Sequence, residues 1–522
     1  MEKGVNISRS PHAVPTSWML LACVAAVVAQ FFWEGRYGFS LADEGFLWYG
    51  AQRVLAGEVP VRDFMAYDPG RYYVSAAWMA LWADNGVMVL RGALAIVQGL
   101  GLLIGLLLLT HERRDRSILW LLTAMSTLMV WMFPRHRMFD VVTSLGLLYA
   151  LTRLASKPSG RRFFVAGIAV GLAAVFGQNH GVYGLIASLG VIGYASIRRP
   201  PEYQRTRGIL VWGAGVVVGF SPVLVMLAAI PGFATQYWEG IRFLFEIRAT
   251  NLPLPVPWPW LVSFSNTSLA ESMHDLVTGL FFVALALFAV AGIAWILRGL
   301  RRGSVDTVVT ASAFLALPYA HFTFSRADLD HLAQGVFPFL VGSLAFLGSR
   351  RSPVRWSLSL GLCAASLLVM VPKHPGVQCR YVRECVEAQV GADLLRLDLQ
   401  TAEQVGLLHR LAADFAPAGG SFVAVPYWPG AYALLGRRSP MWSIYALFPR
   451  GLKFQEDEID RIRAADPAFI VIMDHPLDGR DALRFSNTHS VIDRFLTEAF
   501  TRLDGYSTNP NYQVLVAPRL AP

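Results

Sequence analysis

The stretch that decides the fold is SLADEGFLWYGAQRVLAGEVPVRDFMAYDPGRYY, from Ser40 to Tyr73. It follows directly on an apolar run at 16–33, which is long enough to predict a membrane span. Two adjacent acids, Asp43 and Glu44, therefore lie at a predicted membrane surface, followed by more acids and arginines among aromatic residues. Ionisable groups are costly in such a place, so they call for a structural or functional reason.

The composition indicates that much of the remaining chain also lies in a membrane. Of the 522 residues, 54% are hydrophobic and 16% are charged, and the mean hydropathy is +0.44. A soluble protein of this length is less apolar. We predict an α-helical polytopic membrane protein with about eleven transmembrane helices. The predicted spans lie near 16–33, 88–110, 117–133, 138–154, 163–178, 181–197, 208–230, 276–298, 306–321, 333–348 and 355–372.

Lys and Arg residues cluster in alternate connections between the predicted spans. This pattern follows the positive-inside rule, so it places the N-terminus in the cytoplasm and, with an odd number of spans, the C-terminus outside. The net charge of +9 therefore reflects orientation and gives no support for nucleic-acid binding. The first span is predicted to be an uncleaved anchor, with a signal peptide as the alternative. The clusters are Lys3 and Arg9; Arg113, Arg114 and Arg116; Arg153, Lys157, Arg161 and Arg162; Arg198, Arg199, Arg205 and Arg207; Arg298, Arg301 and Arg302; and Arg350, Arg351 and Arg355.

The sequence predicts two domains. Residues 1–372 form the membrane domain, whose long first outer loop at 34–87 carries two interfacial helices rich in aromatic residues. Residues 375–522 are less apolar, and helix-like stretches alternate there with strand-like runs such as SFVAVPYW, AFIVIMDH and YQVLVAP. We predict a small α/β domain outside the membrane. Cys379 and Cys385 can form a disulfide in an oxidising compartment or remain two thiols.

Every predicted outer loop contributes ionisable residues that can converge on one outer cavity. Cations in such a cavity suit a phosphate, aromatic walls suit a lipid tail, and a carboxylate suits deprotonation of a hydroxyl. In loop order the residues are Asp43, Glu44, Asp63, Asp68 and Arg71; Arg135, His136, Arg137 and Asp140; His180; Glu239, Arg242, Glu246 and Arg248; and His321, Arg326, Asp328, Asp330 and His331.

Each main candidate also has a purely structural explanation. SLAD fits a capping box, with Ser40 as the N-cap and Asp43 three residues on, and Glu44 suits the first turn of a helix. Asp68 opens the turn sequence Asp-Pro-Gly. Arg135 and Arg137 can be interfacial anchors. His180 can be a polar residue of a loop, and Arg326, Asp328 and His331 can form ion pairs with one another.

The acidic pair after the first span, in a long outer loop with interfacial helices, resembles the GT-C superfamily of membrane glycosyltransferases. Its members include protein O-mannosyltransferases and lipid A aminoarabinose transferases. The stretch ADEGFLWYGAQRVLAGEVPVRDFMAYDPGRYY is similar in style to bacterial members. The multi-span body and the outer C-terminal domain extend the resemblance over most of the chain.

The resemblance implies a hexosyl or pentosyl transferase at the outer face of the cytoplasmic (inner) membrane. Its partners are a sugar donor on a polyprenyl phosphate, membrane lipid and an acceptor hydroxyl on a glycan, lipid or protein, with no nucleic acid. Asp43 is the expected general base of an inverting displacement, and Glu44 orients Asp43 or the acceptor. No cofactor is required, and a divalent metal is left open. By position alone, Arg71, Arg135, Arg137, Arg326 and His331 would bind the donor phosphate, and Asp68, His180 and Asp328 the acceptor or sugar.

Two other functions compete with this interpretation. A transporter or flippase for a lipid-linked sugar also needs cations, aromatic residues and a lipid-sized groove. It is expected to show paired interrupted helices in two related halves, and the sequence lacks such symmetry. A polysaccharide polymerase of another fold more often carries its large outer loop mid-chain. The acids in the first outer loop therefore favour the transferase.

Overall fold

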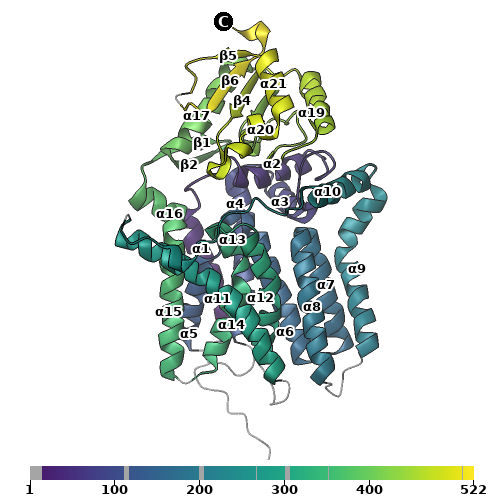
Figure 1. The fold of residues 1–522 in the computed structure, drawn as a ribbon, viewed down its shortest axis with the longest axis vertical. Coiled ribbons are helices and arrows are strands. Elements are labelled where there is room, and N and C mark those ends of the chain that lie inside the picture. The colour runs from purple at the N-terminus through teal and green to yellow at the C-terminus, as the bar shows by residue number, and fades with distance from the viewer. Residues whose placement is uncertain are drawn as a thin grey trace, which may run out of the picture. The chain divides into compact units, whose positions relative to one another are not determined.

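A computed structural model describes residues 15–110, 117–198, 205–265, 267–299, 306–350, 352–507 and 509–521, without the side chains of 205 and 206. Helices make up most of the described chain, and its C-terminal part contains a small sheet domain (Figure 1). This confirms the predicted fold class of a polytopic helical body with a small α/β domain. The chain forms two compact units, of which the first comprises Met1–Phe31, Leu94–Val225 and Arg248–His374, and the second Phe32–Ala93, Met226–Ile247 and Pro375–Pro522.

All eleven predicted spans fall on helices, because a backbone in lipid must satisfy its hydrogen bonds internally. Within the described residues, eight helices are long and apolar enough to cross a membrane, and a pair bent by 54° makes a possible ninth. The eight are α1 (Thr16–Glu34), α4 (Val87–Leu109), α6 (Met138–Ser156), α8 (Gln178–Arg198), α9 (Arg205–Ala229), α11 (Leu269–Gly299), α12 (Thr307–Ser325) and α15 (Ser352–Met370). The bent pair is α13 (Leu329–Gly335) and α14 (Phe337–Gly348).

The remaining two predicted spans are shorter helices. Helix α5 (Ile118–Val130) has 13 residues, so it is about 20 Å long and shorter than a bilayer's hydrocarbon core of about 30 Å. Helix α7 (Gly160–Phe176) has 17 residues and carries two arginines in its first turn. The predicted number of about eleven therefore exceeds the eight or nine that the described residues support. Several of the basic residues used for orientation lie outside the described residues: Lys3, Arg9, Arg113, Arg114, Arg116, Arg199, Arg301, Arg302 and Arg351.

Helices α7 and α9 of the first unit pack with their backbones in contact. Two glycines four residues apart on α7, Gly167 and Gly171, face Gly215 and Gly219 on α9. A Cβ atom on Gly167 would overlap the carbonyl oxygen of Trp212. Because apolar helices gain little hydrophobic stabilisation from meeting in lipid, such close van der Waals packing holds them together. Helix α8 lies beside α6 and α7 (Figure 1).

The second unit begins with the predicted first outer loop, and the two predicted helices are present there. Helix α2 (Asp43–Leu55) carries the acidic pair, and α3 (Pro69–Trp82) starts with a proline, which suits the first helical position. Helix α10 (Phe233–Ile247) also belongs to this unit. Helix α2 packs on α18 (Pro429–Leu434) of the C-terminal domain, and a Cβ on Gly45 would overlap the backbone of Gly430.

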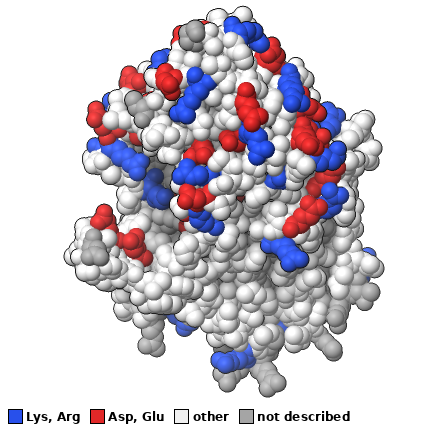
Figure 2. Space-filling model, turned by 45° about the horizontal axis from the view of Figure 1, so that its top comes forward, with Lys and Arg blue, Asp and Glu red and all other residues white. Residues whose placement is uncertain are grey.

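The C-terminal domain contains a hairpin and a four-stranded sheet. The sheet order is β3-β4-β6-β5, with β3 parallel to β4 and the other pairs antiparallel. All residues of β3 and β4 are buried, which explains their continuous apolar sequences. Figure 2 shows acidic and basic side chains interspersed over the part of the surface that this domain forms. The elements are β1 (Cys385–Val390), β2 (Asp393–Asp398), α17 (Leu399–Phe415), β3 (Phe422–Val425), α19 (Leu452–Ala465), β4 (Phe469–Met473), α20 (Phe485–Thr488), α21 (Ser490–Ala499), β5 (Thr501–Leu503) and β6 (Tyr512–Val516).

Of the two alternatives for the cysteines at the start of this domain, the structure has the disulfide. Cys379 is bonded to Cys385, the first residue of β1. Cys23 on α1 and Cys363 on α15 are buried and have free thiols, as expected of small apolar residues in spans.

Candidate active site

Asp43 is the first residue of α2, and its carboxylate contacts a tyrosine. The hydroxyl of Ser40 accepts a hydrogen bond from the backbone N–H of Asp43 at 2.9 Å, which is one half of the predicted capping box, although the N-cap residue of α2 is Ala42 and not Ser40. The Asp43 side chain does something else: its Oδ1 accepts a hydrogen bond from the Tyr445 hydroxyl at 2.9 Å. Asp43 is partly exposed. Capping therefore accounts for the backbone of Asp43 but leaves its carboxylate directed at a hydroxyl.

Aromatic rings surround the contact between Asp43 and Tyr445. Phe46, one turn along α2, packs against the rings of Tyr445 and Tyr67 at centroid distances of 5.3 and 5.2 Å. Tyr427, just after β3, lies 6.1 Å from Tyr445. These rings restrict how the carboxylate and the hydroxyl can move. They also provide an apolar wall with polar edges, which suits the ring of a substrate.

Glu44, the next residue, lies in a buried ion pair. Both of its carboxylate oxygens accept hydrogen bonds from Arg91, at 2.7 Å to Nε and 2.6 Å to Nη2. Arg91 also donates to the carbonyl oxygens of Gly35 and Gly38, each at 2.6 Å. A buried pair is tolerated when its geometry is bidentate and its remaining donors are bonded. This environment favours a role for Glu44 in holding α2 in place, one residue from Asp43.

Asp68 and Arg71 form a second buried pair, at the start of α3. Asp68 is the N-cap residue of this helix, so the predicted turn is in fact a helix start. One of its oxygens lies 3.6 Å from the Arg71 guanidinium, and both residues are 6% exposed. Burial raises the pKa of Tyr237 on α10 to about 12, and the negative charge of Asp68 contributes to the shift.

In the first unit, a chain of hydrogen bonds links α6, α8 and α12. The Oδ1 of Asp140 lies 2.9 Å from Nε2 of His180, whose Nδ1 lies 2.7 Å from the Tyr319 hydroxyl. All three residues are at most 3% exposed. Because both ring nitrogens of His180 are bonded inside the bundle, its setting favours a structural role over the predicted contact with a sugar. Arg137 lies 4.0 Å from Asp140, and Arg135 and Arg137 are partly exposed at the start of α6.

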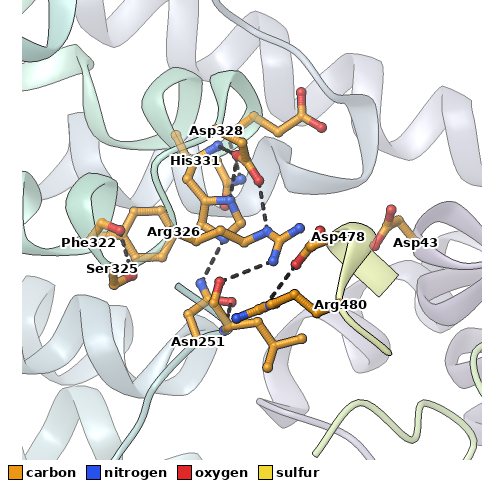
Figure 3. A network of polar contacts seen from close by, with 12 residues as sticks. Asp43, Asn251, Phe322, Ser325, Arg326, Asp328, His331, Asp478 and Arg480 are labelled. Atoms are coloured by element: carbon orange, nitrogen blue, oxygen red, sulfur yellow. Dashed lines mark hydrogen bonds and ion pairs between the residues drawn. The ribbon is translucent and has the colours of Figure 1, made fainter. Parts of the chain in front are cut away.

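The residues between α12 and α13 form a network (Figure 3). Arg326 donates to Oδ2 of Asp328 at 2.8 Å and to the carbonyl oxygen of Leu252 at 3.1 Å. Nδ1 of His331 lies 2.7 Å from Oδ1 of Asp328, and its Nε2 lies 2.8 Å from the amide nitrogen of Asn251. The predicted candidates therefore pair with one another, as their structural explanation expected. They fasten the segment around Asn251 to the start of α13.

The contacts of this network also affect the pKa of Asp328. The amide oxygen of Asn251 accepts from the N–H of Leu252, so its nitrogen faces His331 and donates to Nε2. Burial raises the pKa of Asp328, but the hydrogen bonds and charge of His331, together with the charge of Arg326, outweigh it, so the pKa of Asp328 lies below its usual value.

Sequence reasoning missed four residues of the second unit. Tyr427 and His475 follow the carboxyl ends of the parallel strands β3 and β4, where ligands often bind in open sheets, and the Tyr427 hydroxyl lies 2.9 Å from Nδ1 of His475. Burial and the charge of Arg484 lower the pKa of His475. Tyr445 gave no signal because its segment has no recognisable motif. Arg91 did give one, as a lone arginine in the first turn of a predicted span.

The described part of the chain contains no group of three or more His, Cys, Asp or Glu side chains arranged to hold a metal ion. No protein-family model matches the sequence, and no curated protein matches it.

Solved structures do match the fold. The crystal structure of ArnT from Cupriavidus metallidurans bound to undecaprenyl phosphate is 13% identical, covers 98% of this chain and 100% of that chain, and has a TM-score of 0.53. The apo structure of the same ArnT is 13% identical, covers 97% of this chain and 99% of that chain, and has a TM-score of 0.49. The apo structure of the Archaeoglobus fulgidus oligosaccharyltransferase is 12% identical, covers 93% of this chain and 73% of that chain, and has a TM-score of 0.46. The likeness to the first structure shows that this chain has the GT-C fold, as its resemblance implied, in a multi-pass membrane protein.

Proposed function

We propose that the protein is a membrane glycosyltransferase that moves a sugar from a polyprenyl-phosphate donor to an acceptor hydroxyl. Its fold is that of ArnT, a protein whose structure has been solved with undecaprenyl phosphate bound. The observation that carries the proposal is the contact of Asp43, whose carboxylate accepts a hydrogen bond from a hydroxyl at 2.9 Å. A carboxylate held in this way is suited to take a proton from the hydroxyl of an acceptor.

The proposed reaction is a single displacement. As the acceptor oxygen bonds to the anomeric carbon of the sugar, Asp43 takes the proton of that hydroxyl. The bond between the anomeric carbon and the phosphate oxygen breaks, and polyprenyl phosphate leaves with the electron pair. Attack opposite to the leaving group inverts the anomeric centre. General-base catalysis of this kind typically contributes about 10²–10⁴-fold in rate.

The leaving phosphate carries negative charge, so cations are expected to hold it. Arg135 and Arg137 are candidates because they are partly exposed beside the N-terminus of α6, which favours anions. Arg71, Arg326 and His331, which lie in the pair and network described above, remain candidates by position as well. Asp68 and Asp328 remain candidates for binding the sugar or acceptor.

We place the site on the outer face of the inner membrane. The positive-inside pattern of the sequence supports this orientation. So does the disulfide between Cys379 and Cys385, because disulfides persist in oxidising compartments outside the cytoplasm. Asp43 and the disulfide belong to the same compact unit.

The test is the variant Asp43→Asn, which keeps the shape of the side chain and removes the base. We expect transfer to fall by at least about 10²-fold, the usual contribution of a general base. The donor is the lipid-linked sugar fraction that accumulates in a strain lacking the gene. The acceptor is a membrane preparation of that same strain. With the donor sugar labelled, the assay measures how much label the purified protein transfers to this acceptor.

The matched control is Asp63→Asn, an equal change of charge in the same loop. The Asp63 carboxylate is paired with Arg62. The control should retain transfer. Wild-type transfer by Asp43→Asn would refute the assignment of the base, and movement of the donor across vesicles without transfer would indicate a transporter.

A further inference from the structure

One hydrogen bond joins the C-terminal domain to the proposed base. Tyr445 lies in the irregular segment 435–451, between α18 and α19, and its hydroxyl donates to Oδ1 of Asp43 at 2.9 Å. Among the residues that the structure describes, no other side chain donates to that carboxylate. The partner of Asp43 thus comes from a part of the chain 402 residues away.

The 435–451 segment is fastened to the first loop at several points on the N-terminal side of Tyr445. These contacts are three hydrogen bonds and one ion pair. They are Ser439 N–H to the Tyr49 hydroxyl at 2.9 Å, Met65 N–H to the Trp442 carbonyl at 2.9 Å, Trp442 Nε1 to the Val61 carbonyl at 3.1 Å, and Arg438 to Glu58 at 2.8 Å. The segment therefore cannot shift relative to α2 without breaking them.

The segment is fastened on the C-terminal side of Tyr445 as well. The N–H of Ala446 donates to the carbonyl of Pro426 at 2.8 Å. The guanidinium of Arg450 lies 3.4 Å from the ring centroid of Phe243 on α10, and burial lowers the pKa of Arg450 to about 10. Tyr445 is thus held from both directions. A hydroxyl supported in this way can define the position of its partner.

We propose that Tyr445 is a positioning residue for Asp43, so that the C-terminal domain supplies part of the active site. The inference rests on the proposed function of Asp43 as the base. By bonding Oδ1, the hydroxyl fixes the plane of the carboxylate and leaves Oδ2 to take the proton of the acceptor. A base fixed before the acceptor binds needs no reorientation in the transition state.

The variant Tyr445→Phe separates this role from packing. It keeps the ring that contacts Phe46 and Tyr427 and removes only the hydroxyl. If a hydrogen bond to a charged group acts in the transition state, its loss lowers the rate about 10- to 100-fold. We expect kcat to fall by this factor, while the KM for the lipid-linked sugar fraction stays within about threefold, because in this proposal the hydroxyl acts on the base and not on donor binding.

The matched control is Tyr49→Phe in the full chain. Tyr49 is also on α2, and its hydroxyl also bonds the 435–451 segment, by accepting the N–H of Ser439. It does not touch Asp43. Loss of a hydroxyl that has only a structural role should lower the melting temperature and leave kcat unchanged, and this is the result that we expect of Tyr49→Phe. Tyr445→Phe should show the opposite, with kcat reduced and the melting temperature nearly unchanged.

The outcomes separate this inference from the proposed function. If Asp43→Asn is inactive and Tyr445→Phe has the kcat of the wild type, the positioning role is wrong and the base is retained. A fall in kcat shared equally by Tyr445→Phe and Tyr49→Phe would also overturn it, since it would indicate a general effect of loosening the segment. If Asp43→Asn is active, the proposed function itself fails.

Discussion

Two adjacent acids, Asp43 and Glu44, have different surroundings. Successive residues of a helix point about 100° apart, so a pair in sequence is not a pair in space. Asp43 is partly exposed and bonds Tyr445, whereas Glu44 is buried and bonds Arg91. The resemblance implied a shared catalytic task for them. The contacts support a division in which one carboxylate can react and its neighbour fixes the helix.

This division predicts the effect of breaking the buried pair. Arg91→Met leaves the Glu44 carboxylate buried without its bidentate partner, which typically costs about 3–5 kcal/mol. We expect a large drop in melting temperature and a low yield of folded protein. The measurement is thermal unfolding of the purified full chain in detergent. The control is Arg463→Met, whose partner Asp460 is as exposed as itself, so the loss there should stay below about 1 kcal/mol.

The companion variant Glu44→Gln distinguishes the two roles of this acid. If Glu44 holds the helix, stability and transfer should decline together. If the variant keeps wild-type stability and loses transfer, Glu44 acts in the chemistry, as the resemblance implied, and the structural assignment is wrong.

At this scale the sequence predicted the candidates but not their partners. Asp43 stood out because it follows a span, and Ser40 because it fits a capping pattern. Tyr445 could not be found this way, since it lies 402 residues from Asp43 in a segment without a repeat or motif. Periodicity reports which face of an element is buried and says nothing about which distant group meets it.

Among the elements, the long apolar helices were the most predictable. Their sequences are mostly apolar and long enough to cross a bilayer, so hydrophobicity predicts their existence, although α4 and α6 each bury a charged residue, Arg91 and Asp140. Strands β3, β4 and β6 were predicted from short apolar runs, as buried strands allow. Strand β5 (Thr501–Leu503) was not predicted, because it has only three residues, none of them buried, and depends on β6 for its pairing.

The contact between α7 and α9 predicts which glycine substitutions disturb the packing of these two helices. A Cβ on Gly215 would overlap the carbonyl oxygen of Phe164, whereas one on Gly213 meets no atom within 4 Å. Gly215→Leu should therefore force the helices apart, at a cost of at least about 1–3 kcal/mol, and Gly213→Leu on the same helix should be tolerated. Fluorescence-detected size exclusion after heating measures both. Equal stability of the two variants would show that α7 and α9 do not pack through these glycines.

The whole molecule forms two compact units that are discontinuous in sequence. The prediction of a membrane domain at 1–372 and an outer domain at 375–522 stays a prediction. By its contacts, most of the first outer loop, Phe32–Ala93, groups with α10 and the C-terminal part of the chain in one compact unit. The reason is packing between distant segments, such as α2 against α18. The proposed base and the C-terminal domain therefore belong to one compact unit, and the side of the membrane on which this unit lies decides where the proposed reaction takes place.

That side can be tested with the four native cysteines. Cys379 and Cys385 form the disulfide of this unit, and Cys23 and Cys363 are buried on α1 and α15. If the unit lies outside the cytoplasm, a membrane-impermeant reductant followed by an impermeant maleimide should label the protein in intact spheroplasts. Without the reductant the label should be absent, because a disulfide does not react and the other two thiols are covered.

The control is the variant Cys379→Ser/Cys385→Ser, which should stay unlabelled under all these conditions and so shows that the signal comes from this pair. Labelling of the wild type only after the membrane is made permeable would place the unit in the cytoplasm. That result would contradict the positive-inside interpretation and the outer location of Asp43 together, because the same compact unit contains both. It would leave the assignment of the base untouched, since the contact between Asp43 and Tyr445 lies within that unit and does not depend on its side.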